Sequence, residues 1–155
     1  MLERILRTRW LVRLPVHLYR AHLGFLLGSR MLCLQHRGRS SGQPRYVVLE
    51  VLERRHDPEA YVVICGLGPR SQWYRNVVAD PRVQVFAGSR YAVSATAVRL
   101  PTTDVVGVLD HYAATRPRLY VRFATLLRGW ADDGSEPDWR TRVPMFALTL
   151  DAGSA

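Results

Sequence analysis

Two glycine-containing stretches of the chain combine residue types that suit an anionic ligand. Residues 38–45 read GRSSGQPR, and residues 65–76 read CGLGPRSQWYRN. Glycine lets the main chain approach a ligand closely, and arginine carries a planar fork of N–H donors that matches phosphate or carboxylate. Each stretch also adjoins a short apolar run. Together they predict a site for one large anionic ligand.

The first stretch places hydroxyl groups between two arginines. Ser40 and Ser41 can donate hydrogen bonds to phosphate oxygens. Arg39 and Arg45 can neutralise negative charge, and Gly42 allows close approach. Taken alone, the same composition is also typical of a surface turn, so the prediction depends on the second stretch as well.

The second stretch has the form of a tight passage from a strand into a helix. Gly66, Gly68 and Pro69 shape the passage, and Ser71 is a suitable N-cap for a helix over residues 73–79. The first turn of such a helix presents free backbone N–H groups to an anion. The helix is expected to stop at Asp80, because the following proline cannot continue it.

The surrounding sequence predicts the elements that position these stretches. Apolar and β-branched runs indicate strands over residues 31–35, 46–52, 61–65, 83–87, 90–99 and 144–150. Helical patterns cover residues 101–115 and 119–130. Strands joined by short turns, with few helices, favour a mainly β (α+β) fold: an antiparallel barrel with peripheral helices.

The length of 155 residues points to one domain. We expect a basic, amphipathic helical lead-in over residues 1–29, a barrel domain over residues 30–151 and a frayed tail over residues 152–155. The lead-in is expected to pack on the core or on a partner subunit. The alternative is a peripheral contact between residues 2–28 and a membrane surface.

Composition narrows the class of protein. The formal net charge is +9, and all 22 basic residues are arginine, so the chain attracts anions. Helix-turn-helix and RRM patterns are missing, which argues against a nucleic-acid partner. Cys33 and Cys65 have no metal-ligand or CxxC spacing. Without a signal-like segment or a long apolar stretch, the sequence predicts a cytoplasmic protein, with the inner face of the cell membrane as the place of any peripheral contact.

The two stretches carry a family resemblance. GRxSGxPR at residues 38–45, WYRN at residues 73–76 and ADPxV at residues 79–83 resemble the deazaflavin-dependent nitroreductase family, a branch of the flavin/deazaflavin oxidoreductases with a split β-barrel fold. The resemblance spans residues 30–150. It implies coenzyme F-420, a deazaflavin with a phosphate and an oligoglutamate tail, and hydride transfer from its reduced form to a hydrophobic or planar acceptor: quinone-like, unsaturated or nitroaromatic.

Carried over by position, the resemblance divides the cofactor between the two stretches. The residues expected to contact the cofactor are Arg39, Ser40, Ser41, Gly42, Arg45, Ile64, Cys65, Gly66, Gly68, Arg70, Ser71, Trp73 and Asn76. Arg39, Ser41 and Arg45 would hold the phosphate or the acidic tail. Residues 64–66 would lie along the ring, and Trp73 and Asn76 would shape the ring pocket.

The chain departs from the family pattern in its cations. Many relatives have lysine where this chain has Ser40, and Arg70 is the residue that could replace that charge. This keeps FMN open as an alternative cofactor on the same fold. A second alternative is a non-catalytic carrier of F-420 or a tetrapyrrole. A homodimer is expected by analogy with other split barrels.

The resemblance also implies an acceptor side near the C-terminal third. Tyr112, Tyr120, Phe123 and Trp130 are the candidate lining residues. Tyr120 is the preferred proton donor or orienting group. The simpler interpretation of all four is that they are core aromatics. The five histidines show no metal-ligand spacing, and no metal is expected.

Overall fold

A computed structural model describes residues 16–17, 28 and 30–153. The predicted lead-in helix lies largely outside these residues. The described elements are β1 (Met31–Arg37), β2 (Pro44–His56), β3 (Glu59–Ile64), α3 (Gln72–Ala79), β4 (Arg82–Ala87), β5 (Arg90–Arg99), α4 (Thr102–Thr115), α5 (Pro117–Ala131), the 3-10 turn η2 (Trp139–Arg142) and β6 (Met145–Leu150).

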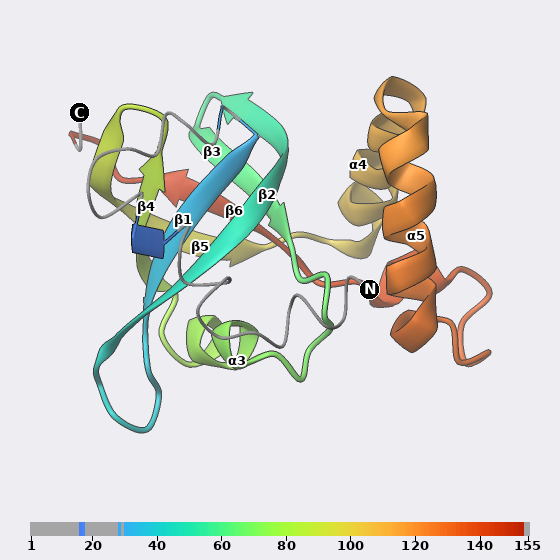
Figure 1. Cartoon of the computed structure of the whole chain (residues 1–155), viewed down its shortest axis with the longest axis horizontal. Helices are drawn as coiled ribbons and strands as arrows, with labels where there is room; N and C mark the ends of the chain where they lie inside the picture. Colours follow the sequence, from blue (N-terminus) through green and yellow to red (C-terminus); the bar gives the residue numbers. More distant parts are fainter. Residues whose placement is uncertain (1–15, 18–27, 29, 154–155) are drawn as a thin grey trace.

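The strands form a closed antiparallel barrel in the order β1-β2-β3-β6-β5-β4, with β4 pairing back onto β1 (Figure 1). Neighbours along the chain form the β1–β2, β2–β3 and β4–β5 hairpins. β6 then inserts between β3 and β5, with Val63 opposite Phe146 and Ala97 opposite Leu148. The predicted antiparallel barrel with peripheral helices is confirmed.

The alternation of side chains along each strand divides the core in two. Tyr61 and Val63 of β3 point into the barrel, where they join Leu34 of β1 in one cluster. Val62 and Ile64 point outward and pack in a second cluster with residues of α4 and α5. Figure 1 shows these two helices side by side at one flank of the barrel.

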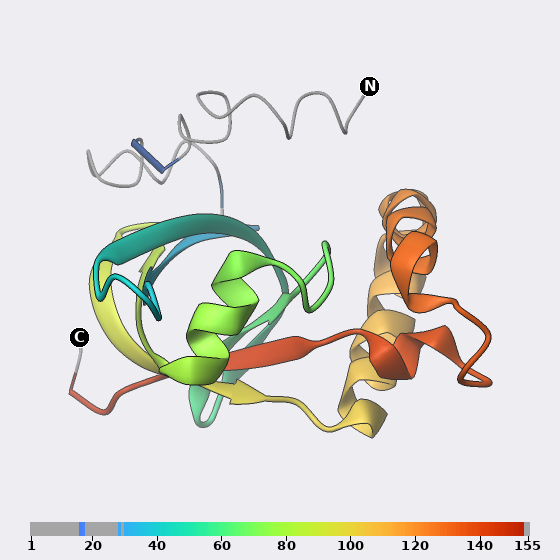
Figure 2. The same cartoon turned by 90° about the horizontal axis from the view of Figure 1, so that it is seen from below.

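The short helix α3 covers one end of the barrel. Trp73 and Val77 are buried with the inward strand residues, and the Trp73 ring meets Phe146 edge-on at a centroid distance of 5.9 Å. Figure 2 shows α3 in front of the ring of strands. The loop between β1 and β2 lies at the same end, where Arg39 contacts Gln72 and Asn76 of α3.

Two elements differ from the prediction. β2 runs from Pro44 to His56 rather than over residues 46–52, because it pairs with β1 as far as Pro44 and with β3 as far as His56. Its charged end carries ion pairs: Arg54 with Glu59 at 3.0 Å and Arg55 with Glu53 at 2.7 Å. Part of the predicted polar turn before β6 is the 3-10 turn η2, where Asp138 accepts a hydrogen bond from the backbone N–H of Arg140. Among the described helices, none is long and apolar enough to cross a membrane.

Candidate functional site

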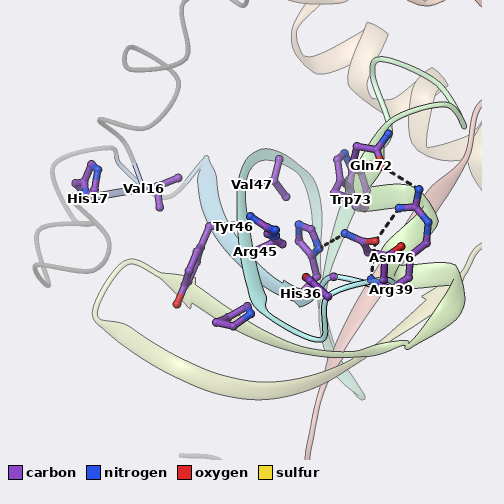
Figure 3. Close-up of a pocket in the computed structure, with 14 residues that line it drawn as sticks. Val16, His17, His36, Arg39, Arg45, Tyr46, Val47, Gln72, Trp73 and Asn76 are labelled. Atoms are coloured by element: carbon purple, nitrogen blue, oxygen red, sulfur yellow. Dashed lines mark hydrogen bonds between the residues drawn. The ribbon is translucent and has the colours of Figure 1, made fainter.

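A cavity of about 810 Å³ lies between the β1–β2 hairpin and α3 (Figure 3). Its walls come from parts of the chain that are far apart in sequence. The lining residues are Val16, His17, His36, Gly38, Arg39, Ser40, Ser41, Pro44, Arg45, Tyr46, Val47, Gln72, Trp73 and Asn76. The cavity therefore joins the first anion-binding stretch to the end of the second.

The hairpin loop is held by its own backbone. Gly38 donates to the carbonyl of Gln43 at 2.9 Å, and Gly42 donates to the carbonyl of Gly38 at 2.8 Å. Gly42 has a φ of +68°, a conformation that a residue with a Cβ rarely adopts. A Cβ at Gly38 would lie 2.6 Å from Ser41 Oγ. The two glycines thus allow the tight turn that presents Ser40 and Ser41 to the cavity.

Arg39 ties this loop to α3. Its backbone N–H and its Nη1 both donate to Asn76 Oδ1, at 3.1 and 2.8 Å, and its Nη2 donates to Gln72 Oε1 at 2.9 Å. Asn76 is buried, with 5% of its surface exposed. The guanidinium of Arg39 therefore spends much of its donor capacity on the protein itself and fixes the hairpin against the helix.

Behind this contact lies a buried histidine. His36 is 5% exposed, and its Nδ1 lies 3.2 Å from Asn76 Nδ2. Burial, together with the nearby charge of Arg45, lowers the pKa of His36 to about 4. The imidazole is therefore neutral at physiological pH. Figure 3 shows the Arg45 side chain beside the His36 ring.

Arg45 is a cation of the cavity wall whose side chain has no partner among the described residues. It pairs with His36 across the hairpin, so both side chains lie on the same side of the sheet. Arg45 is exposed, and within residues 30–153 it makes no ion pair and no hydrogen bond from its side chain. A planar guanidinium in this position suits an anionic oxygen.

The second stretch forms a braced loop between β3 and α3. Gly68 has a φ of +80° and lies under the Trp130 ring, whose Nε1 donates to the carbonyl of Gly66 at 2.9 Å. Ser71 is the N-cap residue of α3, but its hydroxyl makes no capping bond and contacts Cys65 Sγ at 3.0 Å. Burial raises the pKa of the Cys65 thiol, so it is not a ready thiolate.

The aromatic residues expected on the acceptor side pack between α5 and the barrel. Tyr112 is buried and donates a hydrogen bond from its hydroxyl to Glu50 at 2.8 Å. Tyr120, Phe123 and Trp130 pack against the outer core cluster. The Phe123 ring also faces Gly66. None of the four lines the cavity, but Phe123 and Trp130 support the loop that precedes α3.

The structure divides the expected cofactor residues into two groups. Arg39, Ser40, Ser41, Arg45, Trp73 and Asn76 line the cavity. Gly42 borders a second cavity of about 390 Å³, which shares His36 and Pro44 with the first. Ile64, Cys65, Gly66, Gly68, Arg70 and Ser71 form the end of β3 and the braced loop beside α3, and they do not reach the cavity wall.

Sequence reasoning missed several lining residues, of which His36, Val47 and Gln72 are the most informative. A signal for His36 was present: it follows Leu32 and Leu34 at period two, which predicts an inward side chain. Gln72 precedes the expected helix start by one residue. Val47 had no signal beyond its place in an apolar run.

The match to a family decides the class of protein. The sequence model of the family described as "F-420H(2)-dependent quinone reductase" matches residues 10–125. The chain belongs to this family. It is an F-420-dependent oxidoreductase with the split-barrel fold, as the two motifs predicted. Comparison with curated protein sequences gives no match.

Solved structures share the fold of this F-420-dependent oxidoreductase. A structure described as an F-420-H2 dependent reductase (FDR-A) superposes with a TM-score of 0.54 at 22% identity, covering 77% of this chain and 93% of that one. A domain-swapped dimer has a TM-score of 0.54 at 21% identity, covering 86% and 98%. An FMN-binding protein related to pyridoxamine 5'-phosphate oxidase, from Nostoc punctiforme, has a TM-score of 0.51 at 14% identity, covering 93% and 80%.

Proposed function

We propose that the cavity between the β1–β2 hairpin and α3 binds reduced F-420, and that the protein passes a hydride from it to a hydrophobic or planar acceptor of the quinone type. The observation that carries the proposal is the position of Arg45. Its guanidinium makes no ion pair or hydrogen bond within residues 30–153, and it lines the cavity between two elements that the Arg39–Asn76 contact joins. The reduced deazaflavin supplies the hydride.

The lining of the cavity fits such a ligand chemically. Its volume lies within the range of about 300–1,000 Å³ typical of cofactor sites. Arg45 and the hydroxyls of Ser40 and Ser41 offer a cation and donors for a phosphate or carboxylate. Trp73 and Val47 offer an apolar wall for a flat ring. The charged and apolar parts lie on different elements, so one elongated ligand can satisfy both.

The residues of the braced loop have a supporting role in this proposal. The loop sets the start of α3, and α3 carries Trp73 and Asn76 into the cavity. Arg70 is exposed in the same loop and can meet an acidic tail that extends beyond the cavity. Ile64, Cys65 and Gly66 lie outside the cavity wall, so in this proposal they act through the position of α3 and not by contact with the ring.

The acceptor is proposed to approach beside α5. Phe123 and Trp130 contact the loop that precedes α3, and Leu67 in this loop is 58% exposed. Tyr120 is half-buried on the same helix and is the proposed proton donor or orienting group. Tyr112 is less suited to that role, because its hydroxyl is engaged by Glu50.

The direct test is equilibrium binding of F-420 to the purified protein, followed by oxidation of the reduced cofactor in the presence of a soluble quinone. We expect saturable binding and quinone-dependent turnover. Tyr120→Phe should lower turnover while F-420 binding stays unchanged. Absence of F-420 binding at tens of micromolar would overturn the proposal.

FMN is the second candidate cofactor, favoured by the likeness of the fold to an FMN-binding protein. The cavity offers the same cation and hydroxyl donors to the terminal phosphate of FMN. A protein that is yellow as purified, with FMN released on denaturation, would support this alternative. Competition between FMN and F-420 for the protein would show that both use one site.

We also propose that the protein forms a homodimer, supported by the likeness of its fold to a domain-swapped dimer. Light scattering coupled to gel filtration measures the mass directly, against 17.7 kDa for one chain. Peripheral membrane contact through residues 2–28 stays a prediction from sequence. Vesicle co-sedimentation of the full chain and of a chain lacking these residues tests it.

A further inference from the structure

The Asn76 amide has a fixed orientation, because Arg39 offers only donors to it. The backbone N–H and Nη1 of Arg39 both point at one atom of the Asn76 side chain. An NH2 group placed there would face two donors, so that atom is the carbonyl oxygen. The NH2 group of Asn76 is therefore turned toward His36 Nδ1, at 3.2 Å.

This orientation fixes the tautomer of His36. The amide NH2 can only donate, so Nδ1 must accept and carries no proton. A neutral imidazole then has its proton on Nε2. The second ring nitrogen is thus a donor, and it is held in place by a chain of contacts that begins at Arg39.

The Nε2–H donor has no use within the described protein. Among residues 30–153, His36 makes no hydrogen bond besides the one to Asn76. It follows Leu32 and Leu34 on the inward side of β1 and borders the cavity (Figure 3). Within the described residues, Nε2 is not one of the fully buried polar atoms that lack a partner, so it is open to the cavity rather than sealed in the core. A ligand atom that enters the cavity can therefore accept a hydrogen bond from it.

We propose that His36 is a ligand-contacting residue, which donates its Nε2–H to an anionic oxygen held at the same time by Arg45. The two side chains face each other across the β1–β2 hairpin and offer one neutral donor and one cation to the same atom or group. A phosphate or carboxylate oxygen matches this pair. Naming that oxygen as part of F-420 rests on the proposed function, whereas the tautomer and the donor do not.

The tautomer is tested on the ligand-free protein. Nitrogen-15 NMR separates protonated from unprotonated imidazole nitrogens. We expect His36 to show an unprotonated Nδ1 and a protonated Nε2 at neutral pH. Asn76→Asp replaces the donating NH2 with an oxygen that accepts, so the proton of His36 should move to Nδ1 or the ring should gain a second proton. A protonated Nδ1 in the wild-type protein would overturn the proposal.

Two variants of His36 separate the proposed Nε2–H donor to the ligand from the internal contact of Nδ1 with Asn76. In His36→Gln, the amide NH2 can reach the position of Nε2, so ligand binding should stay close to the wild-type value. In His36→Asn, the shorter amide can still meet Asn76 but cannot reach the ligand. We expect its F-420 dissociation constant to rise about tenfold or more. Thermal unfolding of both variants shows that they are folded.

F-420 and inorganic phosphate are added in separate titrations. The nitrogen-15 resonance of His36 Nε2 reports binding in each. A shift with both supports the proposal and the cofactor assignment. A shift with phosphate but no binding of F-420 keeps the donor and overturns the proposed function. Wild-type affinity in His36→Asn, or an Nε2 resonance that neither probe moves, overturns the role of His36.

Discussion

The backbone N–H and the guanidinium of Arg39 both donate to the amide oxygen of Asn76, a residue 37 positions later in the chain. These two hydrogen bonds fix the β1–β2 loop against α3. The pairing of the strands does not by itself set that contact. It also decides which end of the Asn76 amide faces His36. One arginine that resembles a ligand contact in the sequence is therefore in large part a positioning residue.

Asn76→Leu should destabilise the protein by about 3 kcal/mol. The substitution keeps the branching and the number of side-chain heavy atoms but leaves the Arg39 backbone N–H and His36 Nδ1 without their partner. Urea unfolding of the two proteins measures the difference. Gln72→Ala is the control, because it removes one exposed hydrogen bond to the same arginine and should cost less than about 1 kcal/mol.

Arg45→Ala should weaken F-420 binding by about tenfold or more, because it removes the available cation at the cavity rim. Arg37→Ala is a matched control. Arg37 lies on the same hairpin and carries the same charge. Its Nε lies 3.9 Å from Asp80 Oδ2, and it borders the smaller cavity instead of the proposed cofactor site. Titration at low and high salt should show a smaller salt dependence for Arg45→Ala than for wild type. Equal losses in both variants would mean that net charge, and not this site, governs affinity.

Stability should fall as the pH is lowered through the titration range of His36. Burial and Arg45 lower the pKa of His36 from 6.5 to about 4, so the unfolded chain binds the proton more readily between these values. The stabilisation is complete above pH 6.5 and is lost as the pH falls through about 4. The contribution is about 3 kcal/mol.

Urea unfolding across this pH range, in wild type and His36→Gln, isolates the contribution of His36. The variant should show a shallower decline. Asp80 does not obscure the comparison, because its hydrogen bonds to Arg82 hold the pKa of its carboxyl below the usual range. The stabilisation that Asp80 contributes is therefore lost at a lower pH than that of His36. If the free energy of unfolding fell equally steeply with pH in both proteins, the conclusion that His36 is buried in its neutral form would be wrong.

Gly68→Ala should destabilise the loop before α3 by about 1–3 kcal/mol. The residue has a φ of +80°, and a Cβ would lie 3.0 Å from the Trp130 ring. Gly107→Ala is the matched control, because a Cβ there has nothing within 4 Å and the residue lies inside α4. That variant should be unchanged or more stable by up to about 1 kcal/mol. Thermal unfolding of both variants compares the two sites.

The barrel was predictable because its strands are local and strongly patterned. The β4–β5 hairpin turns at Gly88, which has a φ of +59°, between the paired residues Ala87 and Arg90. Ser71 was correctly placed at the start of α3, but its hydroxyl serves Cys65 instead of the helix end. The partner of the Ser71 hydroxyl is set by Cys65 at the end of β3, and the N-cap preference of serine takes no account of such a tertiary contact.

The cavity was only partly predictable, because its walls meet through tertiary contacts. Arg39 and Arg45 stood out by residue type and Trp73 by the family resemblance, and the structure brings all three to one cavity. His36 did not stand out, because a histidine in an apolar strand is usually a satisfied core residue. Its role depends on Asn76, which only the folded chain places beside it.

The position of β6 between β3 and β5 has a consequence for biosynthesis. Until residues 145–150 leave the ribosome, the sheet is open, and β3 and β5 each present an unpaired edge. Such edges pair readily with other chains, and contacts between distant segments form slowly. Translation is therefore the stage at which this architecture is most exposed to aggregation, and a nascent chain stalled before Met145 would be a natural substrate for a chaperone.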